Sequence, residues 1–386
     1  MIPASHSLKT ARAQAFAFLL IAMTFTGQSV RASAGEFPGD VPKDETHGKG
    51  APLHLEQEIE LAGDYLLGKG VPRDPKQSAY WYRKAADQGD PGAQNEIGYF
   101  YLTGIGVPRD EAQAAKWFER SAAAGSARGK LNLAVMYLKG AGVRKDSELG
   151  MKMLNDLAAK DDPLAETYLG MICYLGGCAG KDSASAEKWF LSAAKHHQPE
   201  AEYCMGTLYS ETADHPHDLP RAAEYLRASA TGGYVPGMYS LGLLLTNHPE
   251  IPQRPGEAVQ VLESSANAGI WRSAVVLGIF SRDGSQGFEK DAASAYRWFV
   301  IAEQQGGAEA RQYLKTDVDK LKNGFSPDMV NQQNEIAAEW IQQHPHRDLF
   351  LFGAGRQRAY FPLAEVYAVG SGADELSEGA MITGSK

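Results

Sequence analysis

One arrangement of apolar, small and polar residues returns in this chain every 36 positions. A large apolar residue followed by a small one marks each return: Leu61-Ala62, Ile97-Gly98, Leu133-Ala134, Leu169-Gly170, Met205-Gly206, Leu241-Gly242 and Leu277-Gly278. A second column is mostly aspartate: Asp74, Asp110, Asp146, Asp182, Asp218, Arg254 and Asp291. A third column, seven residues further on, is mostly aromatic: Trp81, Trp117, Met153, Trp189, Tyr225, Val261 and Trp298. A fixed period of this length predicts stacked units that bury their apolar faces against their neighbours.

Each unit is predicted to form two helices. In the second unit, Ile97, Gly98 and Tyr101 lie on one face of the first helix, which we call helix A. Gly104 follows it and suits a left-handed helix cap, because glycine lacks the Cβ that makes this conformation costly. Asp110 stands where the second helix, helix B, begins, and it can accept hydrogen bonds from the first free backbone N–H groups. We expect the residues of the aromatic column to be core residues of helix B.

The period stops after residue 307, and two capping helices are predicted over 308–344. Residues 308–322 form the first helix. The second is predicted to have Ser326 as its cap and Pro327 at its first position, and to end near Gln343. Residues 345–386 contain apolar groups as well as a glycine- and serine-rich end. We expect them to be a tail that is partly disordered or partner-binding.

The stretch from Leu61 to Asp74, followed by Ala79-Tyr-Trp-Tyr-Arg-Lys-Ala-Ala, resembles the Sel-1-like repeat, a relative of the tetratricopeptide repeat. The resemblance extends over residues 55–307. It implies an all-α fold, a right-handed α-solenoid of seven helix–turn–helix repeats, with a surface that holds another macromolecule. The glycine turn is replaced in units five and six, over 211–217 and 247–252, where reshaped loops but intact helices are expected.

The first 34 residues have the pattern of a secretory signal peptide. Lys9 and Arg12 are basic, residues 13–26 are apolar, and Ala32-Ser33-Ala34 is a small-residue cleavage signal. The apolar run would rise only ~21 Å as a helix, short of the ~30 Å hydrocarbon core of a membrane. We therefore expect cleavage near Ala34, a linker over 35–54, no integral membrane segment afterwards, and a periplasmic or secreted protein.

Composition and charge narrow the choice of partner. The chain has 386 residues with 44% hydrophobic and 22% charged residues, as in a soluble folded protein. Its net charge is −9, and it becomes −12 without residues 1–34, which carry three basic and no acidic side chains. An acidic chain without basic clusters argues against binding nucleic acid or an anionic membrane surface. We expect a monomer that binds a protein or peptide, without a cofactor.

The three cysteines are open to two interpretations. An exported protein reaches an oxidising compartment. Cys173 should end a helix and Cys178 should lie in the following loop, so the two could form a local disulfide. The alternative is three unpaired thiols. Cys204 has no obvious partner in either case.

Catalytic and metal-binding patterns are weak. His215 and His217 lie near Asp218 and could contribute to a zinc site, but a solvated loop is favoured, and we expect no metal. Ser-x-x-Lys, the spacing of penicillin-recognising enzymes, occurs at Ser185-Ala-Glu-Lys188 and Ser192-Ala-Ala-Lys195. The companion motifs Ser-Asp-Asn and Lys-Thr-Gly are absent. The chain is predicted not to be an enzyme, with weak binding or hydrolysis of β-lactams or cell-wall precursors as the alternative.

A helical wheel of helix A places four positions away from the buried columns. They lie two and three residues before the small residue of the pair, and one and five after it. In the tetratricopeptide fold helix A lines the concave surface, so the resemblance implies that this stripe is exposed there. The stripe contains Asn95, Glu96, Tyr99, Tyr168, Met171, Tyr203, Thr207, Tyr239 and Leu243. Aromatic residues are enriched at interface centres, so Tyr203 and Tyr239 are predicted to bind a partner. Alternatively, several of these residues pack against neighbouring A helices, above all Met171 and Leu243.

These observations favour an exported, non-enzymatic scaffold or regulatory adaptor. Proteins with the similar architecture include periplasmic regulators of sensor kinases, scaffolds for exopolysaccharide export and secreted factors that engage host proteins. The sequence does not choose among these roles. A quality-control adaptor of the endoplasmic reticulum is a further alternative if the source is a eukaryote.

Overall fold

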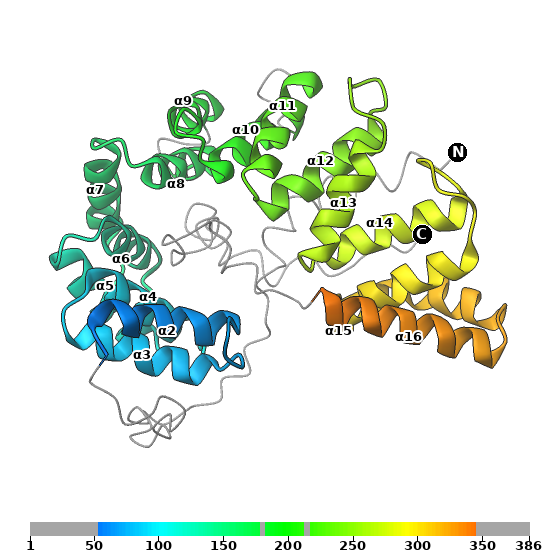
Figure 1. Cartoon of the computed structure of the whole chain (residues 1–386). Coiled ribbons are helices and arrows are strands. Elements are labelled where there is room, and N and C mark those ends of the chain that lie inside the picture. The colour runs from blue at the N-terminus through cyan, green and yellow to red at the C-terminus, as the bar shows by residue number, and fades with distance from the viewer. Residues whose placement is uncertain (1–52, 178–181, 212–216, 345–386) are drawn as a thin grey trace, which may run out of the picture. The chain divides into compact units, whose positions relative to one another are not determined.

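The computed structural model describes residues 53–177, 182–211 and 217–344. In these residues every regular element except an isolated bridge residue is a helix, so the predicted all-α class is confirmed. The described helices follow one another along the chain (Figure 1), and the described residues form two compact units. The first ends at Ala186 and the second begins at Glu187, inside one helix.

The first unit consists of successive helix pairs. Its helices are α2 (Leu55–Leu67), α3 (Pro75–Asp87), α4 (Pro91–Thr103), α5 (Glu111–Ala123), α6 (Ala127–Lys139), α7 (Ser147–Ala158), α8 (Pro163–Tyr174) and the start of α9 (Ser183–Ala194). The even-numbered helices are A helices and the odd-numbered ones are B helices. From α2 to α8 each helix packs against the next one along the chain, and α4 also contacts α6.

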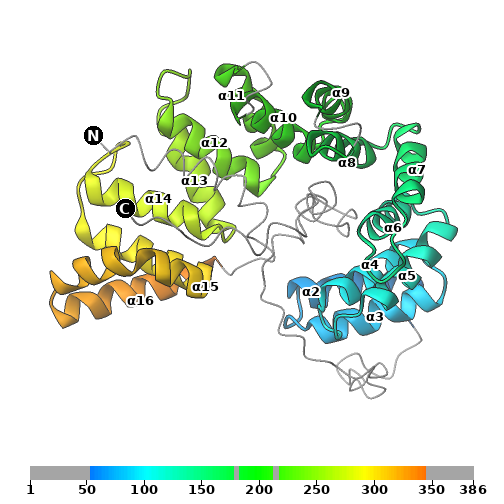
Figure 2. The ribbon, with the colours of Figure 1, turned by 180° about the vertical axis from the view of Figure 1, so that it is seen from behind.

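The second unit continues the same alternation and ends in the cap. It contains the rest of α9, then α10 (Pro199–Glu211), α11 (Leu219–Thr231), α12 (Val235–Asn247), α13 (Glu257–Asn267), α14 (Trp271–Asp283), α15 (Ala292–Asn323) and α16 (Pro327–Gln343). The helix α15 is two helices joined at Gly307, where φ is 60°. The predicted helix over 308–322 is its second half. The helix α15 packs against α16 (Figure 2), which begins at Pro327 after the Ser326 cap, as predicted.

Backbone caps at both helix ends follow the predicted columns. Asp110 accepts a hydrogen bond from the Gln113 N–H at 3.0 Å, and other aspartates of the column cap their helices in the same way: Asp74, Asp146, Asp218 and Asp291. Gly104 ends α4 with a φ of 78°, in the left-handed region. Each aspartate satisfies N–H groups that a helix start would otherwise leave without partners.

The core column of helix B differs from the prediction by one residue. In six of the seven units the residue of the aromatic column is only half-buried, and Trp117 is the exception. The residue after it is buried in every unit: Tyr82, Phe118, Leu154, Phe190, Leu226, Leu262 and Phe299. The aromatic column lies at the edge of the core, where a large ring covers apolar groups and can also meet a surface charge. Thus the ammonium group of Lys84 lies 4.8 Å from the centre of the half-buried Trp81 ring.

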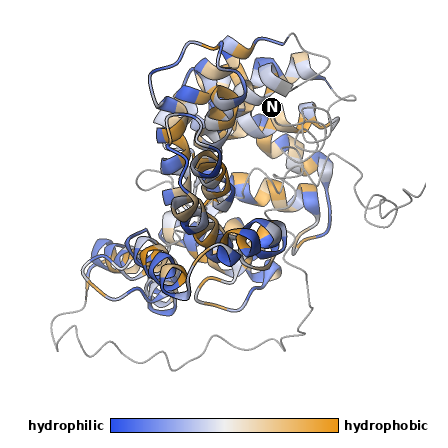
Figure 3. Ribbon diagram, turned by 90° about the vertical axis from the view of Figure 1, so that its right-hand side faces the viewer, coloured by the Kyte–Doolittle hydropathy of each residue, from blue (hydrophilic) through white to orange (hydrophobic). Residues whose placement is uncertain are grey.

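The small residue of each pair lets helix A approach this core column. A Cβ at Gly98 would lie 2.8 Å from the Phe118 ring, and one at Gly278 would lie 2.4 Å from Phe299. Neither distance is compatible with a real side chain, so the pairing of a large and a small residue is a packing requirement. Figure 3 shows hydrophilic and hydrophobic residues alternating along the helices, as expected for two-sided packing.

The sixth helix pair departs from the repeat at its turn. Arg254 stands where the other units have aspartate, and α13 begins after Gly256, whose φ is 72°. The start of α13 has no side-chain cap, and the Glu257 carboxylate instead accepts a hydrogen bond at 2.9 Å from the backbone N–H of Arg254, which lies before the helix. The expected reshaped loop with intact helices is therefore found here. The other reshaped loop falls on residues 212–216, which lie outside the described residues.

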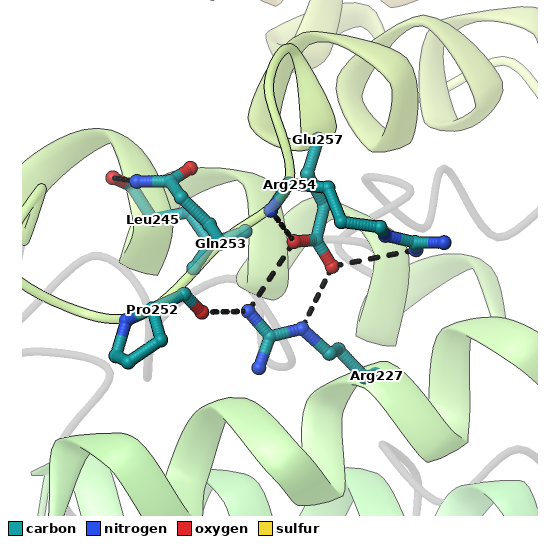
Figure 4. Close-up of polar contacts among 6 residues, drawn as sticks. All are labelled: Arg227, Leu245, Pro252, Gln253, Arg254 and Glu257. Atoms are coloured by element: carbon teal, nitrogen blue, oxygen red, sulfur yellow. Dashed lines mark hydrogen bonds and ion pairs between the residues drawn. The ribbon is translucent and has the colours of Figure 1, made fainter.

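A buried ion pair anchors this turn to the preceding B helix (Figure 4). Arg227 of α11 donates to the Glu257 carboxylate from Nε at 2.7 Å, and to the Pro252 carbonyl from Nη2 at 2.6 Å. The Glu257 side chain is only 2% exposed. Burial raises the pKa of Glu257, but the hydrogen bonds from Arg227 and Arg254 and their positive charges lower it by more, so the net shift is downward.

Candidate partner-binding surface

The residues predicted to bind a partner come from four A helices. Asn95, Glu96 and Tyr99 lie on α4, Tyr168 on α8, Tyr203 and Thr207 on α10, and Tyr239 and Leu243 on α12. The structure buries several of them, contrary to the expected exposure: Asn95, Tyr99, Tyr168, Met171 and Tyr203. The exposure on which their predicted role rested is therefore wrong for these five residues.

The reason lies in how many neighbours helix A has. The wheel treated helix A as packed on one side, whereas α4 contacts α3, α5 and α6. Asn95 accepts a hydrogen bond at 2.8 Å from Nδ2 of Asn132 on α6, and both side chains are buried. The Tyr203 ring lies 5.4 Å from Tyr234. The alternative interpretation, packing between neighbouring helices, holds for these side chains.

Four residues of the stripe stay partly accessible. Glu96, Thr207, Tyr239 and Leu243 are half-exposed. Of these, Tyr239 and Leu243 lie on the same A helix of the second unit. They are the residues from which a binding surface can be built.

An aromatic group beside Tyr239 extends that surface. Trp271 begins α14, and its ring lies 6.0 Å from that of Tyr313 on the second half of α15. The Arg272 guanidinium lies 4.2 Å from the Trp271 ring and pairs with Glu309 at 2.7 Å. We call Tyr239, Leu243, Trp271 and Tyr313 the helix-A aromatic surface.

The polar groups of this surface have defined protonation states. Burial raises the pKa of Tyr239 to about 12; the charge of Arg272 opposes the shift and Tyr313 adds to it. The Tyr239 hydroxyl is therefore protonated at physiological pH. Tyr313 is 65% exposed. The surface thus offers ring faces, the Tyr313 hydroxyl and a charged pair to an incoming chain.

Sequence reasoning missed Trp271 and Tyr313 for two reasons. Trp271 is the first residue of α14, outside the four wheel positions. Tyr313 lies beyond the end of the repeat, but it occupies the column of Val276 once the one-residue insertion in the last unit is counted. Continuing the column past residue 307 would have found it.

The weaker chemical candidates lie on helices and turns. Ser185 uses its backbone N–H to complete the Asp182 cap of α9 at 3.0 Å. Lys188 and Lys195 are exposed, whereas a catalytic lysine base is found in a desolvated pocket. Asp218 caps α11, and His215 lies outside the described residues. Within the described ranges no group of three His, Cys, Asp or Glu residues is arranged to hold a metal ion.

The cysteine and signal-peptide predictions are tested only in part. Cys204 is a free, buried thiol, and burial raises its pKa. Cys178 lies outside the described residues, so its bond to Cys173 stays a prediction, as does the signal peptide over 1–34. Among the helices of the described part of the chain, none has the length and apolar character to cross a membrane.

Helix pairs at a constant period, most of them with an aspartate cap on helix B, define a helical repeat protein. The model of the Sel1 repeat matches residues 58–90, 91–126, 127–162, 163–197, 199–234 and 272–307, more than half of the chain. The chain belongs to the Sel1 repeat family. The unmatched pair, α12 and α13, is the one with the Arg254 turn, so the number of seven repeats stays a prediction.

Solved structures similar to this chain include Sel1 repeat proteins. A Sel1 repeat protein from Oxalobacter formigenes is 27% identical, with a TM-score of 0.53, covering 65% of this chain and 99% of that one. The protective antigen c5321 of uropathogenic Escherichia coli is 22% identical over 86% and 74% of the chains, with a TM-score of 0.38. Immunity protein Pa5087 from Pseudomonas aeruginosa is 16% identical over 66% and 84%, with a TM-score of 0.36. No curated protein matches the chain. Sel1 repeats generally mediate protein–protein interaction.

Proposed function

We propose that this chain is an exported, non-enzymatic scaffold or regulatory adaptor that binds a protein or peptide through the helix-A aromatic surface of its second unit. The observation that carries the proposal is Tyr313, an aromatic side chain left 65% exposed beside Trp271. Exposed aromatic groups flanked by polar ones are typical of binding sites, because they bury a large area at a small entropic cost.

The proposed cellular location and the proposed side of partner binding rest on the sequence. The signal pattern over 1–34 supports a periplasmic or secreted monomer. In tetratricopeptide-like folds helix A lines the concave side, and the proposed partner lies there. Scaffolding of polysaccharide export is one such role, and regulation of a membrane sensor is another.

Binding is tested by crosslinking in cells, followed by capture of the tagged chain from the exported fraction. The test variant is Leu243→Ala with Tyr313→Ala, which removes apolar area without touching a fully buried side chain. The matched control is Met329→Ala on α16, also an exposed apolar residue. We expect one dominant protein, retained by wild type and control and lost in the double variant. Equal retention by all three chains would refute this surface.

A further inference from the structure

A nearly buried carboxylate near the start of α10 has no hydrogen-bond donor among the described residues. The Glu202 side chain is only 7% exposed, and the ion pair that it forms is with His197, whose Nδ1 lies 3.9 Å from its Oε1. That distance is too long for a hydrogen bond. The His197 side chain is 92% exposed and carries a charge only when protonated. Buried carboxylates are normally held by cations or donors, so Glu202 lacks the partner that its burial requires.

The first helix pair shows what a carboxylate at this position takes up. Glu58 of α2 stands four repeats before Glu202, and its side chain is 2% exposed. It accepts hydrogen bonds from Nζ of Lys84 on α3 at 2.6 Å and from Nε2 of Gln88, the residue that ends α3, also at 2.6 Å. Helix B and its last residue thus supply both a cation and a neutral donor to the carboxylate of helix A.

The contact between these two positions is a property of the repeat. In the third helix pair they hold Lys130 on α6 and Asp156 on α7, whose charged groups lie 3.1 Å apart. The charges are exchanged relative to Glu58 and Lys84, but the spacing of 26 residues is the same. An ion pair at these positions therefore follows from the packing of helix B on helix A.

The fifth helix pair has lost both donors. Ala228 of α11 stands where α3 has Lys84, and Gly232 stands where Gln88 ends α3. Neither residue has a polar side-chain atom. The carboxylate of Glu202 has thus been kept while the groups that hold the equivalent Glu58 are absent.

The packing of this pair is nevertheless that of the first. The Asp218 N–H donates to the Tyr209 carbonyl at 3.1 Å, and the equivalent bond from Asp74 to Tyr65 measures 2.9 Å. A Cβ at Gly232 would lie 2.5 Å from the Pro199 ring, so the end of α11 lies directly against the start of α10. The missing cation therefore reflects the side chains of α11 and not a different arrangement of the helices.

The charges around Glu202 favour an added cation. Burial raises the pKa of Glu202, the charge of His197 opposes the shift, and Glu200 in the same helix turn adds to it. Glu200 is itself buried and accepts a hydrogen bond from Nε2 of Gln198. A second carboxylate beside Glu202 increases the gain from a bound positive charge. Ala228 is half-exposed, so a group from outside can reach the position that Lys84 fills in the first pair.

We propose that Glu202 is a binding site for a lysine side chain of the protein partner, whose ammonium group takes the place that Nζ of Lys84 has beside Glu58. This inference rests on the proposed function, because it takes the partner to be a protein, but it uses residues outside the helix-A aromatic surface. A long apolar stem that ends in a single charge reaches a nearly buried carboxylate from the surface, which suits lysine. The net charge of −9 also favours a basic partner segment.

Nuclear magnetic resonance of the full chain with isotope-labelled glutamate side chains tests the site directly. The probe is Nα-acetyl-lysine-N-methylamide, and its neutral norleucine analogue is the control. The Glu202 carboxyl resonance is assigned by its loss in Glu202→Gln. We expect the lysine probe to shift this resonance saturably and to lower the Glu202 pKa, and the norleucine probe to do neither. Absence of a saturable shift with the lysine probe would overturn the proposal.

The variant Ala228→Lys rebuilds the internal cation of the first helix pair. We expect it to lower the Glu202 pKa without any probe, and to weaken binding of the lysine probe about tenfold, the equivalent of one charged hydrogen bond. The matched control is Ser264→Lys, at the equivalent position of α13, where Met238 stands opposite in place of a carboxylate. It should bind the probe as wild type does. An unchanged Glu202 pKa in Ala228→Lys, or equal probe binding by the two variants, contradicts the assignment.

The role of a partner lysine is tested in the capture experiment described above. Ala228→Lys should lower retention of the captured protein severalfold, and Ser264→Lys should leave it unchanged. Equal retention by both variants would show that the partner does not use this site. If no protein is captured at all, the proposed function fails, whereas saturable binding of the lysine probe still supports the site. The two failures are therefore distinguishable.

Discussion

The ion pair between Arg227 and Glu257 permits a quantitative prediction. Substituting Arg227→Met keeps the apolar length of the side chain but leaves a buried carboxylate without its main cation. Removing one partner of a fully buried pair costs about 3–5 kcal/mol. Here Arg227 is 29% exposed, and Glu257 keeps the N–H of Arg254, so we expect a loss of about 2 kcal/mol.

The loss should be local, because each repeat contacts only its neighbours and arrays of repeats can open in parts. Native-state hydrogen exchange of the α13 amides is therefore the assay. A loss of 2 kcal/mol corresponds to about thirtyfold faster exchange through local opening. The matched control is Arg109→Met, which breaks a surface pair with Glu111 whose side chains are 64% and 38% exposed. Such a pair is worth about 0.5 kcal/mol at most.

The pH dependence gives an independent check on the same pair. The pKa of Glu257 is lower in the folded chain than its ordinary value of 4.5, so its stabilising effect is complete above pH 4.5. It is lost as the pH falls through the lowered folded-state pKa. The stability difference between wild type and Glu257→Gln should therefore shrink below pH 4.5. If Arg227→Met costs no more than Arg109→Met at neutral pH, the assignment of Glu257 as the anchor of this turn is wrong.

Three further predictions concern single positions. His197 adopts a left-handed φ of 52°, so His197→Gly should raise the free energy of unfolding by about 0.5 kcal/mol, measured by urea denaturation. Gly278→Ala should lower the melting temperature by an amount equivalent to about 1–3 kcal/mol, because its Cβ would meet Phe299 at 2.4 Å. Gly63→Ala, with 3.8 Å to its nearest neighbour, should have no such effect. Cys204 should react with a thiol reagent only after denaturation, since it is buried and burial raises its pKa; rapid labelling of the native chain would contradict this.

Much of the fold could be predicted from the sequence, because its determinants are local and repeated. A helix cap is favoured by a short polar side chain such as aspartate, placed two or three residues before a free N–H, and a left-handed turn favours glycine. Asp110 indicates the helix cap and Gly104 indicates the left-handed turn. The period then multiplies each local signal, so that a pattern too weak in one unit becomes clear over the array. The start of α16 could also be predicted, because the Ser326 cap and Pro327 are local signals, although they lie outside the repeat.

The binding surface could be predicted much less well, because exposure depends on what packs against a helix. A helical wheel gives only the angular position of a side chain about the helix axis. It placed Tyr99 and Tyr168 on an open face, but neighbouring elements enclose both. The core column of helix B was predicted one residue too early, since a repeated position does not say whether Trp81 or Tyr82 points more directly into the core.

The sequence by itself therefore determined the helices, their ends, their pairing order and the family, all of which follow from interactions within about one repeat. The tertiary structure alone decided which columns are enclosed, that Arg227 reaches Glu257 across 30 residues, and that Tyr313 gathers with Trp271 at an accessible surface. These outcomes depend on side chains from different helices meeting in space. These contacts depend on how several helices pack at once, and a local sequence pattern does not contain that information.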